Sequence, residues 1–217
     1  MEQNLKRNKL KEYKKTLVLT ELQREIVLGT VIGNASMRKS KTDGAHIKFE
    51  QKKSSSEYVD HLYSIFQDWV GTPPQIRNIE ENLPTSRESI WFRTYSHSAF
   101  LFYYNQFYDE NGNKKIPSTL KKQLTARVLA YWYMDTGSFS LGNEGYYLHT
   151  QCFTKEELIN VCIIFKEKFN LKVSPHLDKG NWKLYIWKES SDAFSALIKP
   201  YILPIFSYKL KKEEKSS

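Results

Sequence analysis

The sequence predicts an α+β protein made of two pseudo-symmetric halves, each with the element order α-β-β-α-β-β-α and an antiparallel four-stranded sheet. Two apolar helical segments, at 20–34 and 125–137, open the halves about 100 residues apart. The same alternation of strands and amphipathic helices follows each of them, and Gln51 and Gln151 end equivalent strands. A duplicated chain of this kind forms a monomer with a pseudo-twofold axis, which suits a partner that itself has twofold symmetry, such as duplex DNA.

The first half is predicted from capping and periodicity. Thr20 is a good helix N-cap, and Gln23 three residues later completes a capping box. The apolar helix that follows has Gly29 and Gly33 four residues apart, so another backbone can approach it closely. In order, the predicted elements are a helix at 20–34, a strand at 45–51, an amphipathic helix at 54–70, strands near 75–80 and 89–95, and a helix at 96–108 that opens with a serine cap.

The second half repeats this order. Thr154 caps its amphipathic helix, with Glu157 at the third helical position as the capping-box partner. A short strand after each apolar helix is inferred from the symmetry of the halves. The predicted elements are a helix at 125–137, a strand at 145–151, an amphipathic helix at 153–169, a hairpin of strands at 171–177 and 182–187, and a helix at 190–202.

Five segments are expected along the chain, and the turn-rich run DENGNKK marks the boundary near its middle. They are a basic N-terminal extension at 1–19, the first half at 20–108, a linker at 109–124, the second half at 125–210, and a basic tail at 211–217.

Composition and charge narrow the class of protein. The chain has 217 residues, with 33 Lys and Arg against 24 Asp and Glu, so its net charge is +9. This excess indicates a polyanionic partner such as nucleic acid, and the alternative is a basic protein without such a partner. A hydrophobic content of 40% argues against a disordered chain, and two cysteines exclude a disulfide-stapled secreted scaffold. Because the chain has no run of about 18 apolar residues and no secretory signal at its start, we expect no membrane partner.

Two nine-residue segments carry the sharpest signal, namely VLGTVIGNA at 27–35 and LAYWYMDTG at 129–137. They resemble the motif of the LAGLIDADG homing endonucleases, in the single-chain form that has two motif copies. The resemblance covers roughly 20–210, because the order of elements agrees as well. It also includes the segments KKIP at 114–117, IKPYILP at 198–204 and YKL at 208–210.

The resemblance implies a fold and a partner. The two motif helices are expected to pack against each other at a two-helix interface along the pseudo-twofold axis. Each half is expected to place its sheet in the major groove of duplex DNA, which has room for β-ribbons. The outward residues expected to contact nucleic acid are His46, Lys48, Glu50, Arg77, Trp91, Arg93, Lys183, Tyr185 and Trp187.

The resemblance also implies Mg²⁺-dependent hydrolysis of phosphodiesters. In the family, the last acidic residue of each motif brings a carboxylate to the end of its helix, and these carboxylates hold the metal ions against the scissile phosphates. A basic residue in each half supports the site. The family positions in this chain are Asn34 and Thr136 for the metal-binding acids, Lys114 or Lys115 and Lys209 for the basic residues, with Lys115 taken as the first candidate.

Neither metal position is acidic in this sequence, so we expect a weak or empty Mg²⁺ site and impaired cleavage. Asp135 is the nearest acid to Thr136, but one helical step rotates a side chain by about 100°, which predicts that Asp135 points away from the metal. It remains the candidate catalytic acid if the enzyme is active.

Three functions follow from these observations. We expect a nucleic-acid-binding protein derived from a homing endonuclease, with duplex DNA or structured RNA as partner, the latter in a maturase-like or ribosome-associated role. The alternative is an active, site-specific DNA endonuclease of intron homing that uses Mg²⁺. The third is a protein-interaction module whose basic surface is incidental. The low cysteine content indicates an intracellular location. The resemblance implies a mitochondrion or another organelle, with a bacterial or phage origin as the alternative.

Overall fold

The computed structural model describes residues 2–41, 44–79 and 87–211, and these form two compact units. Unit 1 comprises Met1–Arg24 and Ala35–Tyr104, and unit 2 comprises Glu25–Asn34 and Asn105–Ser217. The boundary therefore passes through an apolar motif helix, most of which belongs to unit 2. The expected basic tail lies outside the described residues beyond Lys211.

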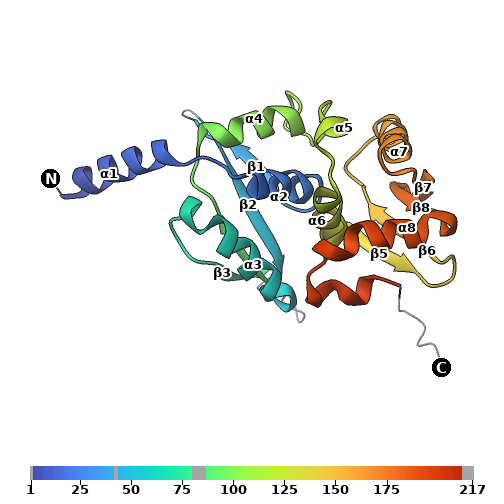
Figure 1. Ribbon diagram of the computed structural model, residues 1–217. Coiled ribbons are helices and arrows are strands. Elements are labelled where there is room, and N and C mark those ends of the chain that lie inside the picture. Colours follow the sequence, from blue (N-terminus) through green and yellow to red (C-terminus); the bar gives the residue numbers. More distant parts are fainter. Residues whose placement is uncertain (1, 42–43, 80–86, 212–217) are drawn as a thin grey trace. The chain divides into compact units, whose positions relative to one another are not determined.

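Unit 1 contains one antiparallel sheet in the strand order β1-β2-β4-β3. Its strands β1, β2 and β3 are labelled in Figure 1. Helix α3 contacts β2 and β4 on the inner face of this sheet. The elements are α1 (Glu2–Thr16), the start of α2 (Glu21–Ile32), β1 (Ser36–Lys39), β2 (Ala45–Lys52), α3 (Ser56–Phe66), β3 (Gln75–Ile79), β4 (Arg87–Arg93) and most of α4 (Ser98–Phe107). Short 3₁₀ turns at Lys53–Ser55 and Gln67–Trp69 flank α3.

Unit 2 contains a second antiparallel sheet with the equivalent strand order, β5-β6-β8-β7. Helix α7 contacts β7, and α8 contacts β6 and α6. The elements are the rest of α2, α5 (Leu120–Gln123), α6 (Ala126–Thr136), β5 (Gly137–Ser140), β6 (Gly145–His149), α7 (Lys155–Phe169), β7 (Val173–Asp178), β8 (Asn181–Ile186) and α8 (Lys188–Ile198), followed by 3₁₀ turns at Lys199–Tyr201 and Pro204–Lys209. Two four-stranded antiparallel sheets of the same order confirm the predicted α+β fold class.

Aromatic side chains fill the core of each unit. In unit 1, Phe49 on β2 stacks on Phe92 of β4 with ring centroids 4.9 Å apart, and Phe66 of α3 packs 5.3 Å from Phe49. In unit 2, Tyr133 of α6 and Tyr146 of β6 both pack against Phe194 of α8, at 5.4 and 5.0 Å. Since all six rings are buried, these clusters hold the helices against the sheets.

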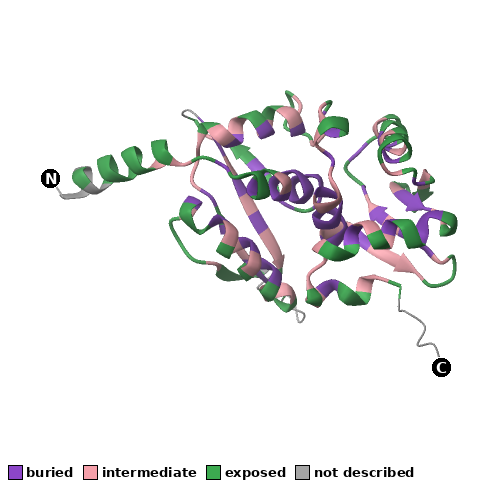
Figure 2. Cartoon of the chain, in the orientation of Figure 1, coloured by how far each residue is buried: buried purple, intermediate pink, exposed green. Residues whose placement is uncertain are grey.

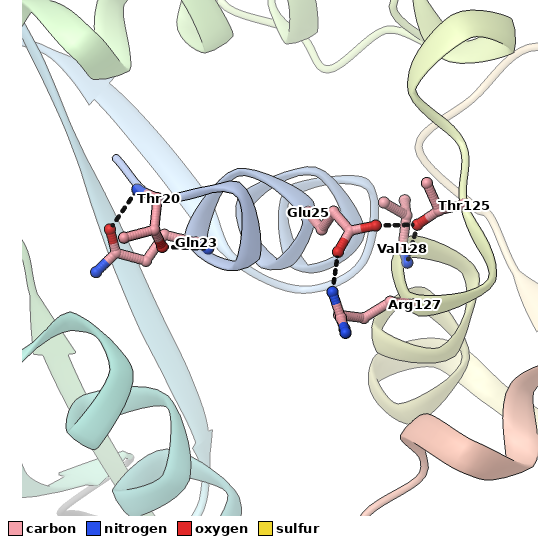
Figure 3. A network of polar contacts seen from close by, with 6 residues as sticks. All are labelled: Thr20, Gln23, Glu25, Thr125, Arg127 and Val128. Atoms are coloured by element: carbon pink, nitrogen blue, oxygen red, sulfur yellow. Dashed lines mark hydrogen bonds and ion pairs between the residues drawn. The ribbon is translucent and has the colours of Figure 1, made fainter. Parts of the chain in front are cut away.

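The predicted capping boxes are present. The Thr20 N–H donates to Gln23 Oε1 at 3.0 Å, and the Gln23 N–H donates to Thr20 Oγ1 at 3.2 Å (Figure 3). Thr154 and Glu157 form the same reciprocal pair at the start of α7. The serine cap expected for the helix at 96–108 is wrong, because His97 performs this role: the Ala99 N–H donates to His97 Nδ1 at 3.0 Å.

Two other differences concern the helices. The N-terminal extension, expected only as a basic segment, forms α1, whose described side chains are mostly exposed (Figure 2). The predicted helix at 190–202 begins earlier and ends as α-helix at Ile198, because Pro200 cannot donate a backbone hydrogen bond and the chain tightens into a 3₁₀ turn. No helix among the described residues has the length and apolar character needed to span a membrane.

The paired ends of helices α2 and α6 as candidate functional site

The motif helices α2 and α6 approach closely within unit 2, and Gly29 makes this approach feasible. A Cβ atom on Gly29 would lie 2.5 Å from Val128 O and 2.7 Å from Tyr131 Cβ, closer than real Cβ contacts. The interface is dry, since Ile26, Val27 and Val31 of α2 have no exposed surface. The prediction that glycine in the first motif admits another backbone is confirmed.

One end of this helix pair is joined by a half-buried ionic contact. Glu25 of α2 is only 14% exposed and accepts a hydrogen bond of 2.5 Å from Thr125 Oγ1, the N-cap residue of α6 (Figure 3). The same carboxylate pairs with the guanidinium of Arg127. Because Thr125 also accepts from the Val128 N–H at 3.2 Å, Glu25 ties the first turn of α6 to α2.

The opposite end of the pair is where the resemblance implies the reaction centre. We call it the helix foot: Gly33 and Asn34 at the end of α2, Met134, Asp135 and Thr136 at the end of α6, and the side chains of Lys114 and Lys209. The Asn34 N–H donates to Asp135 Oδ2 at 3.1 Å, and Asn34 Nδ2 donates to the Asp135 carbonyl at 3.1 Å. The Asp135 carboxylate therefore lies against Asn34, and its direction relative to a metal ion stays a prediction.

Thr136 directs its hydroxyl back into its own helix. Its Oγ1 donates to Trp132 O, one turn earlier, at 3.1 Å. Threonine hydroxyls commonly bond to this carbonyl inside helices. Position 136 therefore presents a neutral hydroxyl whose hydrogen is already used.

Two lysine ammonium groups lie at the helix foot. Lys114 Nζ donates to Gly33 O at 2.9 Å, and Lys209 Nζ donates to Met134 O at 2.6 Å. Burial lowers the pKa of both lysines, and the nearby Asp135 carboxylate opposes this shift. Of the two lysines in the KKIP segment, the structure brings Lys114 to the foot, whereas the contact shown for Lys115 is a backbone bond to Phe107 O at 2.7 Å.

This donor set does not fit Mg²⁺. The foot offers one carboxylate, Asp135, which accepts from the Asn34 N–H, and the positive charges of Lys114 and Lys209 act on the same region. Within the described part of the chain, no group of three or more His, Cys, Asp or Glu side chains could hold a metal ion. Mg²⁺ normally needs carboxylates or phosphates to offset its dehydration, and Asn34 and Thr136 supply no charge.

The outer face of the sheet in unit 1 is cationic. Glu50 lies at its centre, paired with Lys48 Nζ at 2.5 Å and Arg77 Nε at 2.8 Å. Burial alone would raise the pKa of Glu50, but these cations and a hydrogen bond from Ser89 lower it overall. A cavity of about 270 Å³ is lined by Ser36, Arg38, His46, Lys48, Arg77, Trp91 and Arg93. Six of the nine predicted contact residues, including Glu50, thus gather on one face.

His46 is part of this cationic face. Burial lowers its pKa first, and the positive charges of Arg93 and Arg38 lower it further. Lys48 also lies over the Trp91 ring, with Nζ 5.0 Å from the centroid. A neutral imidazole can both donate and accept hydrogen bonds, so this face combines phosphate-binding cations with groups able to contact base edges.

The outer face of the sheet in unit 2 is aromatic. Tyr185 packs 4.8 Å from Tyr147, 4.9 Å from His176 and 5.4 Å from Trp187, and it is only 5% exposed as a result. Lys183 pairs with Asp178, so this pair adds no net charge. The predicted Lys183, Tyr185 and Trp187 are on this face, but sequence reasoning missed Tyr147 and His176, whose signal was their alternate placement along β6 and β7.

Comparison with known proteins gives the family. The model of the LAGLIDADG DNA endonuclease family matches residues 24–194. The "Probable intron-encoded endonuclease 1" of Wickerhamomyces canadensis is 31% identical over 210 residues, which are 93% of this chain and 89% of the relative. The "Cytochrome b mRNA maturase bI2" of Saccharomyces cerevisiae is 30% identical over 199 residues, 85% of this chain and 46% of that longer protein.

A solved structure agrees over nearly the whole length. The homing endonuclease I-WcaI, bound to its DNA recognition sequence, superimposes with a TM-score of 0.85 and 31% sequence identity, covering 94% of this chain and 93% of that chain. The chain therefore belongs to the LAGLIDADG DNA endonuclease family, as a single chain with two LAGLIDADG domains.

Proposed function

We propose that this protein binds a specific duplex DNA site and cleaves it poorly or not at all. The helix foot carries this proposal. Its family acid positions are Asn34 and Thr136, and Thr136 turns its hydroxyl into α6. Loss of one directly acting catalytic group typically costs about 10²–10⁴ in rate. Neither family acid position carries a carboxylate here, so we expect the loss in cleavage rate to lie at the upper end of this range.

Duplex DNA is supported as the partner by the cationic face of unit 1 and by a relative. Arginines such as Arg77 and Arg93 can contact guanine in the major groove or hold phosphates. The I-WcaI structure, 31% identical to this chain, contains that enzyme's DNA recognition sequence. The site is expected to be bound by a monomer with two related halves.

Structured RNA is the second candidate partner, and the aromatic face of unit 2 favours it. Unpaired bases of RNA are recognised by stacking on aromatic side chains, and Tyr147, His176 and Trp187 are half-buried rings on one face. The Saccharomyces cerevisiae relative is named an mRNA maturase. An origin in an organellar intron is consistent with both partners.

The partner and the activity can be tested in two steps. First, the protein is incubated with a randomised pool of 30-base-pair duplexes and with a pool of structured RNAs, and the retained molecules are sequenced. Enrichment of one duplex motif, with binding that weakens as salt rises, supports the proposal. Enrichment of RNA alone would replace it with the maturase-like role, and salt-insensitive or absent binding would favour the protein-interaction module.

The second step measures cleavage of the selected duplex with Mg²⁺ and with Mn²⁺. We expect little product from the natural chain and a gain from the Asn34→Asp, Thr136→Asp double variant, which restores both family acids. Efficient cutting by the natural chain that Asp135→Ala abolishes would instead establish the active endonuclease and Asp135 as its acid.

A further inference from the structure

We propose that the helix foot holds a backbone phosphate of the nucleic acid directly, through the ammonium groups of Lys114 and Lys209, and needs no divalent cation to do so. This inference rests on the proposed nucleic-acid binding and names the chemistry of one contact within it. The foot, which in the family is a cation site, is here an anion site.

The charge at the foot is the first argument. The foot contains two ammonium groups, bonded to Gly33 O and Met134 O, and one carboxylate, Asp135, so its described groups carry one net positive charge. Carboxylates at 34 and 136 would make this charge negative by one, and a bound divalent ion would return it to positive by one. The foot of this chain, without a metal ion, thus has the same net charge as a foot that has acids at 34 and 136 and holds one divalent ion.

The geometry of the lysines is the second argument. Each ammonium group has three N–H donors, and the structure uses one of them on a helix carbonyl, Gly33 O for Lys114 and Met134 O for Lys209. These bonds hold both charges at the carboxyl-terminal ends of the motif helices. The last carbonyl groups of a helix have no donor within the helix, so this end favours cations. The remaining donors are available to an anion, and burial strengthens their interaction with one.

The open surface beside the lysines is the third argument. Asn34 is exposed, and its Nδ2 spends one N–H on Asp135 O, which leaves a second N–H for an acceptor. Lys114 and Lys209 are only partly buried. Amide and ammonium N–H groups donate hydrogen bonds to the oxygens of a phosphate, which only accept. They cannot coordinate a metal ion, and the ammonium charge repels it.

The test compares binding with and without a divalent ion. Fluorescence anisotropy measures the Kd for the duplex selected above, in EDTA and in Ca²⁺ at equal ionic strength. For the natural chain we expect Kd values that agree within about twofold. The foot needs no divalent ion, and the equal ionic strength keeps the release of counterions from the phosphates the same. The Asn34→Asp, Thr136→Asp variant is expected to bind about tenfold more weakly in EDTA and to recover in Ca²⁺.

A second pair of variants tests the lysines themselves. Lys114→Met is expected to weaken binding about tenfold and to lower the slope of log K against log salt by about 0.9, the value for one phosphate. Lys166→Met is the matched control. Lys166 is an exposed lysine of α7, the helix that packs against β7 and β8, and its ammonium group donates to Asn170, the residue that follows this helix. Circular dichroism establishes that both variants are folded.

Each outcome decides the inference. Binding by the natural chain that is at least tenfold stronger in Ca²⁺ than in EDTA would overturn it, as would equal losses in Lys114→Met and Lys166→Met. If Lys114→Met fails to fold, the Ca²⁺ response of the acid-restored variant still decides. The absence of any nucleic-acid binding would overturn the proposed function as well, whereas metal-dependent binding would overturn this inference alone.

Discussion

Asn34 and Asp135 are joined by two hydrogen bonds of 3.1 Å that run in the same direction, from the backbone and side-chain N–H groups of Asn34 to the carboxylate and carbonyl oxygens of Asp135. A neutral residue at 34 makes this arrangement favourable, because an aspartate there would set a second carboxylate beside Asp135. The Asn34 amide therefore contributes to holding the ends of α2 and α6 together.

Asp135→Asn is expected to destabilise the protein. The variant keeps an oxygen that can accept from Asn34 but removes the carboxylate whose charge stabilises the partly buried ammonium groups of Lys114 and Lys209. We expect a loss of about 1–3 kcal/mol in the free energy of unfolding, measured by urea denaturation. Thr136→Ser, which keeps the hydroxyl that bonds to Trp132, is the control, and an equal stability for all three proteins would contradict the expectation.

Gly29→Ala tests the close approach of the motif helices. The added Cβ would meet Val128 O at 2.5 Å and Tyr131 Cβ at 2.7 Å, and both belong to rigid parts of α6. Overpacking costs about 1–3 kcal/mol, which outweighs the gain of about 1 kcal/mol for alanine over glycine inside a helix. We expect a lower thermal midpoint. In the control Gly142→Ala the new Cβ has no atom within 4 Å, and a matching loss there would refute the packing argument.

Local signals in the sequence predicted the fold well. The alternation of 45–51 places Ile47 and Phe49 in the core and leaves Lys48 half-buried on the outer face, because strand side chains alternate with a period of two. The capping box at Thr154 depends on residues three apart and was predicted for the same reason. The repeated order of elements then gave two equivalent sheets.

The candidate site was harder to predict, since it depends on contacts between distant residues. Helical rotation alone could not show that Asp135 meets Asn34, because that contact depends on how α2 and α6 pack. The choice between Lys114 and Lys115 depends on how the linker passes the end of α2, because Lys114 bonds to Gly33, which is 81 positions away in the sequence. Helix α1 is also anchored from afar, by Tyr13 Oη donating to Asp68 O at 3.0 Å.

Glu25→Gln tests the ionic contact at the other end of the helix pair. Removing the charge leaves Arg127 beside a neutral amide and weakens the bond from Thr125 Oγ1. A broken buried pair costs up to about 3–5 kcal/mol, and because Arg127 is 34% exposed we expect about 1–3 kcal/mol.

Glu189→Gln is the matched control for this contact. Glu189 is 61% exposed and pairs with Lys172, which is 55% exposed, so its replacement is expected to lower the free energy of unfolding much less than Glu25→Gln does. Urea denaturation measures both variants. Equal losses would show that the contact of Glu25 with Arg127 behaves as an ordinary surface pair.

His149 predicts a pH dependence of stability. Burial lowers its pKa below 6.5, and Lys183 and Lys209 lower it further. The unfolded chain therefore binds a proton more readily than the folded one as the pH falls below 6.5, so the free energy of unfolding decreases there. His149→Gln is expected to make this decrease shallower without abolishing it, because His46 and His61 also have lowered pKa values. Denaturation curves between pH 5 and 8 check this, and unchanged slopes would contradict it.

The two outer sheet faces are expected to respond differently to salt. Arg93 is on the cationic face of unit 1, so Arg93→Gln should weaken binding to the selected nucleic acid and lower the salt slope by about 1 if it holds a phosphate. Trp187 packs 5.4 Å from Tyr185 on the aromatic face of unit 2, so with an RNA target, whose unpaired bases can stack on it, Trp187→Leu should weaken binding by about 1–3 kcal/mol while leaving the slope unchanged. Anisotropy titrations at several salt concentrations measure both quantities. A reduced slope in Trp187→Leu would show that this ring acts by positioning a cation such as Lys172, which lies 4.5 Å from its centroid, and not by contacting a base.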